Sequence, residues 1–245
     1  MSAVACSMDV RAVRLSALDT ADRADLLARY ANEVYAPAFP DAEIREDPDY
    51  WRGLLDADPY PPPPQPRIEV LVLVDGDGRI AGGVTIELYR RANAGLLTYI
   101  SVAPDRRGRG LGKRLIAEAR AALDRFAAPD TPMFAETERM EDAHDDDERA
   151  ATVLRQRRLA GMGARWVEFD YVMPPLRPDT SPHRLHLMIF DGPDAVPAAT
   201  VLALLNELAH ALDTDLDRSG DTRAMAGWLA AQDMLPVVPL PVVAP

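Results

Sequence analysis

One segment constrains the fold more than any other: between Tyr99 and Leu115 an apolar strand pattern leads through a glycine-rich turn directly into an amphipathic helix. Gly108, Gly110 and Gly112 let the backbone of this turn come close to a ligand. The N–H groups of the first helical turn have no partner within the helix, and the helix dipole adds positive potential there. The segment therefore predicts an anion site at the start of the helix. Its basic residues are Arg106, Arg107, Arg109, Lys113 and Arg114.

Two well-known phosphate-binding loops do not fit this turn. A P-loop requires G-x-x-x-x-G-K-[ST], but here Gly112-Lys113 is followed by Arg114, and Arg107 stands where the first glycine should be. A dinucleotide fingerprint requires G-x-G-x-x-G after the first strand of a βαβ unit. The glycines here have a different spacing and follow a predicted antiparallel meander, so both loops are excluded.

The charge and composition narrow the class of partner. The chain of 245 residues has a formal net charge of −12, which argues against nonspecific binding of nucleic acid and favours a cationic or amine-bearing partner. Acidity that only keeps the protein soluble is the simpler alternative. No apolar run approaches the roughly 18 residues of a membrane span, and Met1–Asp9 lacks a signal-peptide pattern. We expect a cytoplasmic protein without a membrane partner, in which the single Cys6 forms no internal disulfide.

Hydrophobic periodicity and turn residues predict the elements. Strands are expected at Val10–Leu15, Ile68–Val74, Ile80–Tyr89, Leu96–Val102, Pro132–Glu138, Arg165–Met173 and Leu185–Phe190. Helices are expected from Asp19 or Thr20 to the stop at Pro37 and Pro40, and at Tyr50–Leu55, Gly110–Phe126 and Asp145–Gly161. The run Pro61–Pro64 should form an extended connector.

The tail from residue 193 to 245 has a different pattern. Its leucine-rich stripe from Val201 to Leu212 predicts one helix, and Met225, Trp228 and Leu229 suggest a second. We interpret the tail as a helical extension packed on a domain of residues 1–192. A surface that holds a homodimer together is the alternative.

The six residues Arg107-Gly108-Arg109-Gly110-Leu111-Gly112 fit the pattern R/Q-x-x-G-x-G/A, after a strand that ends in Val102-x-Pro104. This pattern resembles the acetyl-CoA site of the GNAT superfamily of N-acetyltransferases. The order of elements from Val10 to Phe190 is also similar to the GNAT succession. The resemblance implies an α/β (α+β) fold with a mixed, mostly antiparallel sheet of about seven strands flanked by helices. It covers about the first 190 residues and leaves the C-terminal helical appendage unexplained.

The resemblance also implies a donor and a site for it. Acetyl-CoA or another short acyl-CoA would be the co-substrate, with no metal, and the acceptor would be the amine of a small molecule or peptide. The residues that would hold the diphosphate are Arg107, Gly108, Arg109, Gly110, Leu111, Gly112 and Lys113. The pantetheine arm would lie between Leu96–Val102 and Pro132–Glu138. The thioester would lie near the backbone of Ile100 and Val102, where an N–H can stabilise the oxyanion.

Direct attack by an amine needs a base, and the leaving thiolate benefits from an acid. Glu136 and Glu87 are the candidate bases, and glutamates that merely face solvent are the alternative. Tyr99 could supply a hydroxyl, although an aromatic residue in a sheet more often serves packing. The usual GNAT thiolate acid, a tyrosine, is replaced here by Leu159, and Ala164 replaces the aromatic residue after the glycine. This difference from the family is compatible with another acid or with a thiolate that leaves unaided. It is also compatible with a noncatalytic CoA-binding sensor or protein-interaction module.

Two further groups of polar residues have simpler explanations. The acidic residues Asp142, Asp145, Asp146, Asp147 and Glu148 precede or begin a predicted helix. They can cap that helix, and attraction of a cationic acceptor is the alternative. His183 and His186 have no acidic or cysteine ligand near them in sequence, so we expect no zinc site.

Overall fold

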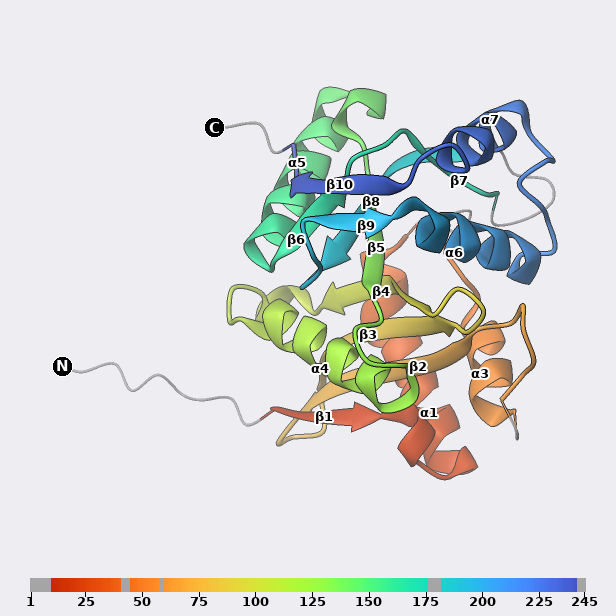
Figure 1. Ribbon diagram of the computed structural model, residues 1–245. Coiled ribbons are helices and arrows are strands. Elements are labelled where there is room, and N and C mark those ends of the chain that lie inside the picture. Colours follow the sequence, from red (N-terminus) through yellow and green to blue (C-terminus); the bar gives the residue numbers. More distant parts are fainter. Residues whose placement is uncertain (1–9, 41–44, 58–59, 176–181, 242–245) are drawn as a thin grey trace. The chain divides into compact units, whose positions relative to one another are not determined.

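The computed structural model (Figure 1) describes residues 10–40, 45–57, 60–175 and 182–241, so Cys6 lies outside the described residues. The chain divides into two compact units. Unit 1 comprises Met1–Ala57, Ile68–Ile86 and Tyr99–Ala122, and unit 2 comprises Asp58–Arg67, Glu87–Thr98 and Leu123–Pro245. Several elements therefore contribute residues to both units, and the tail from residue 193 belongs to unit 2 together with residues 123–192.

Unit 1 is built on the predicted meander. The strands are β1 (Val10–Arg14), β2 (Arg67–Asp75), β3 (Ile80–Tyr89) and β4 (Ala94–Val102), hydrogen-bonded in that order. β1 and β2 are antiparallel, with Val10 opposite Asp75. The turn between β2 and β3 forms because the Asp75 carboxylate accepts the N–H groups of Asp77 and Arg79 at 3.0 and 2.9 Å, an Asx-type turn.

The helices of unit 1 begin where the sequence predicts caps. After the 3₁₀ turn η1 (Leu15–Ala17) come α1 (Thr20–Tyr30), the π-helical segment η2 (Ala31–Tyr35), α2 (Ala36–Ala38) and α3 (Pro48–Asp56). Asp19 caps α1 and Asp47 caps α3 through their carboxylates. The expectation that Pro37 stops the first helix is wrong, because Pro37 lies inside α2. A proline is tolerated in the first turn of a helix, where its missing N–H would have no partner.

The core of unit 1 lies between its helices and strands. Apolar side chains of α1, η2 and α3, including Leu27, Tyr30 and Trp51, pack against those of β2 and β4. Ser101 of β4 joins this contact through a hydrogen bond of 3.1 Å with the buried Tyr30 hydroxyl. The helix α4 (Leu111–Phe126) begins in the same unit, with Leu115 fully buried.

Unit 2 continues the sheet with a change of strand direction. Its strands are β5 (Met133–Glu138), β6 (Ala164–Val167), β7 (Tyr171–Met173), β8 (His183–Phe190), β9 (Ala195–Pro197) and β10 (Met234–Pro239), and its helices are η4 (Met140–Asp142), α5 (Asp146–Gly161), α6 (Ala198–Ala211) and α7 (Gly220–Leu229). β4 and β5 are parallel, and their pairing runs from Gly95 opposite Met133 to Leu97 opposite Ala135. β8 then lies antiparallel to β5, and it also pairs with β6 and β7.

Three expectations differ from the structure. Within the described ranges the sheet has ten strands rather than about seven. The single strand expected at Arg165–Met173 is two, because the N–H of Phe169 turns back to the carbonyl of Val167 at 3.0 Å. The run Pro61–Pro64 is not a simple extended connector. It contains a turn at Pro63 and Pro64, which a cis peptide bond joins, and the N–H of Gln65 donates to the carbonyl of Pro62.

The tail is helical only in part. β10 pairs with β6 on one edge and β9 on the other, as Figure 1 shows, because Leu235 and Val237 alternate into the core in a strand pattern. The tail helices pack on strands of their own unit: Val201, Leu204, Leu205 and Leu208 share one core with Phe134, Leu187 and Ile189. The buried carboxylate of Glu207 in α6 also accepts the N–H groups of Arg91 and Ala92, each at 2.9 Å, in the turn before β4.

We expect Leu205→Ala to lower the free energy of unfolding by about 2 to 5 kcal/mol, because it leaves a cavity among fully buried neighbours. Urea unfolding followed by circular dichroism measures the change. The matched control is Leu154→Ala, because Leu154 lies on a helix of the same unit but is 47% exposed. That change should stay within about 0.5 kcal/mol. Equal losses in the two variants would mean that the tail does not form part of the core.

Candidate functional site

The glycine-rich turn joins β4 to α4 through two residues with left-handed backbone. β4 ends at Val102, the 3₁₀ turn η3 (Pro104–Arg106) follows, and Gly108 and Gly110 have φ values of 76° and 78°. A side chain at either glycine would meet no atom within 4 Å, so the backbone conformation, and not lack of space, requires glycine. α4 then begins at Leu111, with Gly112 in its first turn.

Polar contacts fix the start of this turn. Arg106 forms an ion pair of 2.6 Å with Asp75, in the hairpin between β2 and β3. The N–H groups of the hairpin, first that of Arg79, and then Arg106 lower the pKa of the Asp75 carboxyl. The Arg107 side chain reaches back to the carbonyl oxygen of Val102 at 3.1 Å. Arg106 is therefore part of the support of the turn, although the sequence suggested it only as a source of positive potential.

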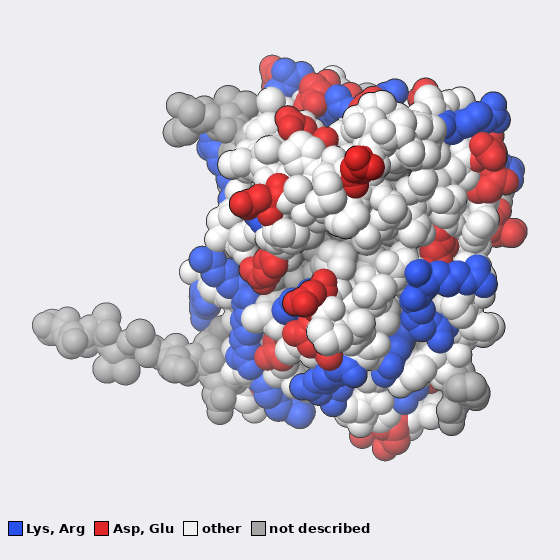
Figure 2. Space-filling model, viewed as in Figure 1, with Lys and Arg blue, Asp and Glu red and all other residues white. Residues whose placement is uncertain are grey.

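The rest of the turn faces solvent. Arg107, Gly108, Arg109, Gly110 and Lys113 are all exposed, whereas the side chain of Leu111 is buried and only its backbone can face a ligand. Figure 2 shows lysine and arginine atoms along the edge of unit 1 on which α4 begins. The first helical hydrogen bond of α4 runs from the N–H of Arg114 to Gly110. The preceding amides have no acceptor within the helix, so the turn combines N–H donors with positive charge.

β4 carries Tyr99, Ile100 and Val102 beyond the part that pairs with β5. Ile100 and Val102 are partly buried, whereas Tyr99 is 7% exposed. The Tyr99 ring lies within 5.0 to 5.5 Å of the rings of Tyr35, Phe39 and Trp51. Its hydroxyl accepts the N–H of Glu46 at 3.0 Å. Tyr99 thus packs in the core of unit 1, the alternative considered for it above.

Glu46 is a feature of this aromatic cluster that the sequence did not single out. Its carboxylate accepts the indole N–H of Trp51 at 2.6 Å, and its carbonyl accepts the Tyr35 hydroxyl at 3.1 Å. Desolvation raises the pKa of the Glu46 carboxyl, and the Trp51 hydrogen bond acts in the opposite direction. Glu46 was missed because its contact with Tyr99, 53 positions away, is made only in the folded unit.

In unit 2, Glu136 is held by a tyrosine. The hydroxyl of Tyr171 donates to the Glu136 carboxylate, and both residues lie on strands that pair with β8, opposite Leu187 and Leu185. Burial, and then the charge of Glu136, raise the pKa of Tyr171, so this hydroxyl stays protonated. Glu136 itself is partly buried. Tyr171 was missed because only the pairing with β8 brings it near Glu136.

Glu87, the other candidate base, is not on the surface. It is 1% exposed, and the hydroxyl of Tyr89 donates to its carboxylate at 2.8 Å. The solvent-facing alternative is therefore wrong for Glu87. Leu159, in the place of the family's tyrosine, is a buried residue of α5, and Ala164 begins β6.

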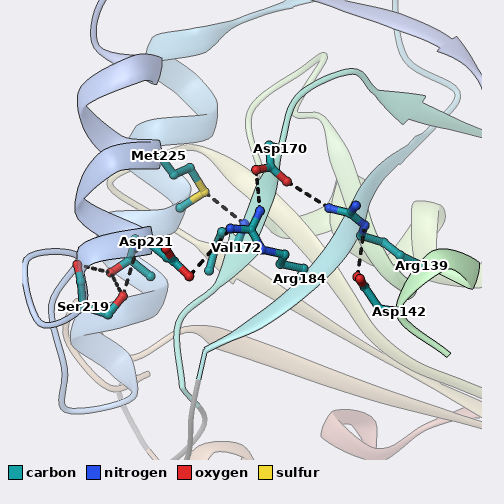
Figure 3. A network of polar contacts seen from close by, with 9 residues as sticks. Arg139, Asp142, Asp170, Val172, Arg184, Ser219, Asp221 and Met225 are labelled. Atoms are coloured by element: carbon teal, nitrogen blue, oxygen red, sulfur yellow. Dashed lines mark hydrogen bonds and ion pairs between the residues drawn. The ribbon is translucent and has the colours of Figure 1, made fainter. Parts of the chain in front are cut away.

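The acidic residues around α5 serve local structure. Asp145 caps the helix by accepting the N–H of Glu148 at 2.8 Å, and Asp142 pairs with Arg139 at 3.1 Å. Figure 3 shows how this pair continues through Asp170, which contacts both Arg139 and Arg184. Arg184 then reaches Asp221 of α7 at 3.7 Å. For Asp142 and Asp145, capping and pairing are what the structure shows.

His186 is buried in β8 beneath Trp166. It is 5% exposed, its ring centroid is 5.0 Å from that of Trp166, and its Nε2 atom has no hydrogen-bond partner among the described residues. Burial lowers the pKa of His186. Within the described ranges no three histidine, cysteine, aspartate or glutamate side chains group as metal ligands do. In the same residues, no helix is both long and apolar enough to cross a membrane.

Fold and turn together define the class of this chain. It has the GNAT fold, a mixed and largely antiparallel sheet flanked by helices, with the glycine-rich turn between β4 and α4. Residues 66–151 match the family model of the acetyltransferase (GNAT) domain. The resemblance to the GNAT superfamily and the predicted fold class are thus confirmed. GNAT acetyltransferases use acetyl-CoA.

Several solved structures are similar to this chain. A protein assigned to the GNAT family of acetyltransferases from Bacteroides thetaiotaomicron is 19% identical, and the match covers 75% of this chain and 88% of that one with a TM-score of 0.50. GCN5 of Tetrahymena is 13% identical over 74% of this chain and 96% of its own, with a TM-score of 0.47. An aminoglycoside acetyltransferase from an uncultured soil metagenomic sample, in complex with sisomicin, is 16% identical. The match covers 58% of this chain and 86% of that one, with a TM-score of 0.39. No curated protein sequence matches the chain.

We expect His186→Phe to reduce the acid sensitivity of the fold. Burial lowers the pKa of His186 below its usual 6.5. The unfolded chain therefore binds a proton at this side chain more readily than the folded chain does. The free energy of unfolding then falls as the pH drops below about 6.5. Between pH 7.5 and 5.5 the wild type should lose up to about 1.4 kcal/mol more than the variant, measured by urea unfolding. His210→Phe, at an exposed position, is the control. Equal losses in wild type and His186→Phe would contradict the prediction.

Proposed function

We propose that this protein is an acyl-CoA-dependent N-acetyltransferase, which transfers the acetyl group of acetyl-CoA to an amine by direct attack. The observation that carries the proposal is the exposed turn with left-handed Gly108 and Gly110 at the start of α4. Such a turn suits a diphosphate, because its N–H groups and the helix dipole favour an anion at close approach. Arg107, Arg109 and Lys113 would add charge, and Arg106 would hold the turn in place.

The way in which β4 pairs with β5 supports a position for the pantetheine arm alongside β4. Its pairing with β5 ends at Leu97, and we propose that an extended ligand binds along β4 after this point as a further strand does. An N–H near Ile100 or Val102 would then stabilise the oxyanion that forms on attack. In this proposal the bound acetyl-CoA supplies the activated acyl carbon, and the protein orients it.

Glu136 is our candidate for the group that takes a proton from the attacking amine. The Tyr171 hydrogen bond orients its carboxylate, and a carboxylate can take a proton from an amine. The amine nitrogen bonds to the acyl carbon, the carbon–sulfur bond breaks, and CoA leaves as a thiolate. Because Leu159 is buried where the family has a tyrosine, we propose that the thiolate leaves without that acid. Glu87 and Tyr99 fit a base or acid less well, since each is engaged inside a core.

A noncatalytic CoA-binding protein is the second candidate, and the replacement of that tyrosine by Leu159 favours it. The two candidates differ in one measurement, the release of free thiol from acetyl-CoA in the presence of a panel of small amines and peptides. Release that depends on the amine supports the enzyme. Binding of acetyl-CoA without release supports the sensor. The homodimer and the cytoplasmic location stay predictions.

The donor site can be tested with Gly112→Asp, which should weaken acetyl-CoA binding at least about tenfold. A carboxylate about 4 Å from a phosphate repels it by roughly 1 kcal/mol in water and about 4 kcal/mol near a protein surface. Gly110→Asp is less suitable for this test, because the positive φ of Gly110 would strain the new side chain. Calorimetric titration measures the dissociation constant of acetyl-CoA. In the same measurement on the wild type, NAD and ATP should bind less tightly than acetyl-CoA.

Gly220→Asp is the matched control for this test. Gly220 lies in the first turn of α7 and is exposed, so the change adds the same charge to the same kind of helix position. We expect that variant to bind acetyl-CoA like the wild type. Thermal melts of both variants show whether the fold persists. If folded Gly112→Asp bound acetyl-CoA with unchanged affinity, the turn would not be the donor site and the proposed function would fall.

For the base, we expect Glu136→Gln to lower kcat by about 100-fold or more at neutral pH while the affinity for acetyl-CoA stays within twofold, because a base acts in the transition state. Glu138→Gln makes the same change on the same strand, at a carboxylate that pairs with Arg155, and should have little effect. Tyr171→Phe should cause a smaller loss. A wild-type rate for Glu136→Gln between pH 6 and 9 would exclude Glu136 as the base.

A further inference from the structure

The aromatic cluster of unit 1 contains a carboxylate that the fold does not need for a helix cap or an ion pair. Asp47, not Glu46, caps α3. Among the described residues no lysine or arginine nitrogen pairs with the Glu46 carboxylate, and the neighbouring Arg45 donates to the carbonyl of Phe39 at 3.1 Å instead. The carboxylate is hydrogen-bonded by the Trp51 indole, a neutral donor. Its negative charge is thus oriented but not compensated.

The surroundings of this carboxylate suit a cation. The ring of Phe39 lies at the outer side of the cluster, 5.4 Å from the ring of Tyr35 and 5.2 Å from that of Tyr99. Ring faces attract ammonium groups, and the attraction grows when water is excluded. Tyr35 and Trp51 are fully buried, whereas Phe39 and Glu46 are only partly buried. Phe39 and Glu46 therefore form the side of the cluster that a ligand can reach.

We propose that Glu46, oriented by Trp51 and lying beside Phe39 on the partly exposed side of the cluster, binds a positively charged group of the acceptor. The inference rests on the proposed N-acetyltransferase function, because Tyr99 directly precedes Ile100, near which the acyl group would lie. A nitrogen held as an ammonium ion at Glu46 has no lone pair for attack, so it is a second cationic group and not the nitrogen that is acylated. The acceptor class is then a diamine or polyamine.

Desolvation supports this assignment. The pKa of Glu46 is raised because its carboxylate has lost water without gaining a cation, and a bound ammonium group would supply the missing partner. Burying a carboxylate without such a partner is costly, which makes this position unusual for a residue with a purely structural role. The formal net charge of −12 would also attract a cationic acceptor at long range.

The test compares 1,4-diaminobutane with 1-aminobutane as acceptors, by release of thiol from acetyl-CoA. In the wild type the KM of the diamine should be at least about tenfold lower than that of the monoamine. In Glu46→Gln the two KM values should become equal, because the second amino group of the diamine loses its partner. Trp51→Phe keeps a ring but removes the N–H donor, and should lose part of the preference. Glu33→Gln, on an exposed glutamate that pairs with Arg29 in the same unit, is the control and should keep it.

The outcomes separate this inference from the proposed function. If both amines are acetylated but the wild type shows no preference, or if folded Glu46→Gln retains it, the inference is overturned and the acetyltransferase stands. If acetyl-CoA is not bound, the proposed function fails. Calorimetric titration of 1,4-diaminobutane tests the cation site without turnover: binding to the wild type that Glu46→Gln loses supports the site, and no binding to the wild type overturns it. A thermal melt confirms that each variant is folded.

Discussion

The passage from β4 into α4 depends on two glycines that take a conformation costly for any other residue. Because Gly108 and Gly110 have positive φ, the chain reverses after Val102 and enters the helix with its first amides exposed. The ion pair of Arg106 with Asp75 fixes the start of this turn on the neighbouring hairpin. β4 and β3 approach closely beneath it, since a Cβ on Gly82 would lie 2.6 Å from the carbonyl oxygen of Ser101. The donor site that we propose is a consequence of this backbone.

Three carboxylates away from the surface share one arrangement. Trp51 donates to Glu46, Tyr89 donates to Glu87, and Tyr171 donates to Glu136. An aromatic donor of this kind orients a carboxylate without neutralising it, whereas an arginine would do both. The arrangement holds each carboxylate in one orientation. It suits a base at Glu136 and a cation site at Glu46, and the two roles predict different kinetic effects, on kcat for one and on KM for the other.

The C-terminal segment belongs to the structure of unit 2 and is not an addition to its surface. Its strand β10 pairs with β6, and Glu207 accepts the amides of the turn before β4. Ion pairs from Asp170 through Arg184 reach α7, where the N–H of Val172 also meets the sulfur of Met225 at 3.2 Å. The same core that the tail completes also encloses Tyr171, the donor to Glu136. Changes in the tail should therefore act on this candidate base through the position of Tyr171.

Local rules determined much of this protein from the sequence alone. The glycine-rich turn, the caps at Asp19 and Asp145 and the meander of β2 to β4 follow from backbone preferences and periodicity, which act over a few residues. Tertiary structure decided the rest. Tyr171 meets Glu136, 35 positions away, only because β5 and β7 both pair with β8. Glu46 meets Tyr99, 53 positions away, only in the folded unit. The strand at Leu235–Val237 forms because β6 and β9 offer it partners, since a strand has no hydrogen bonds of its own.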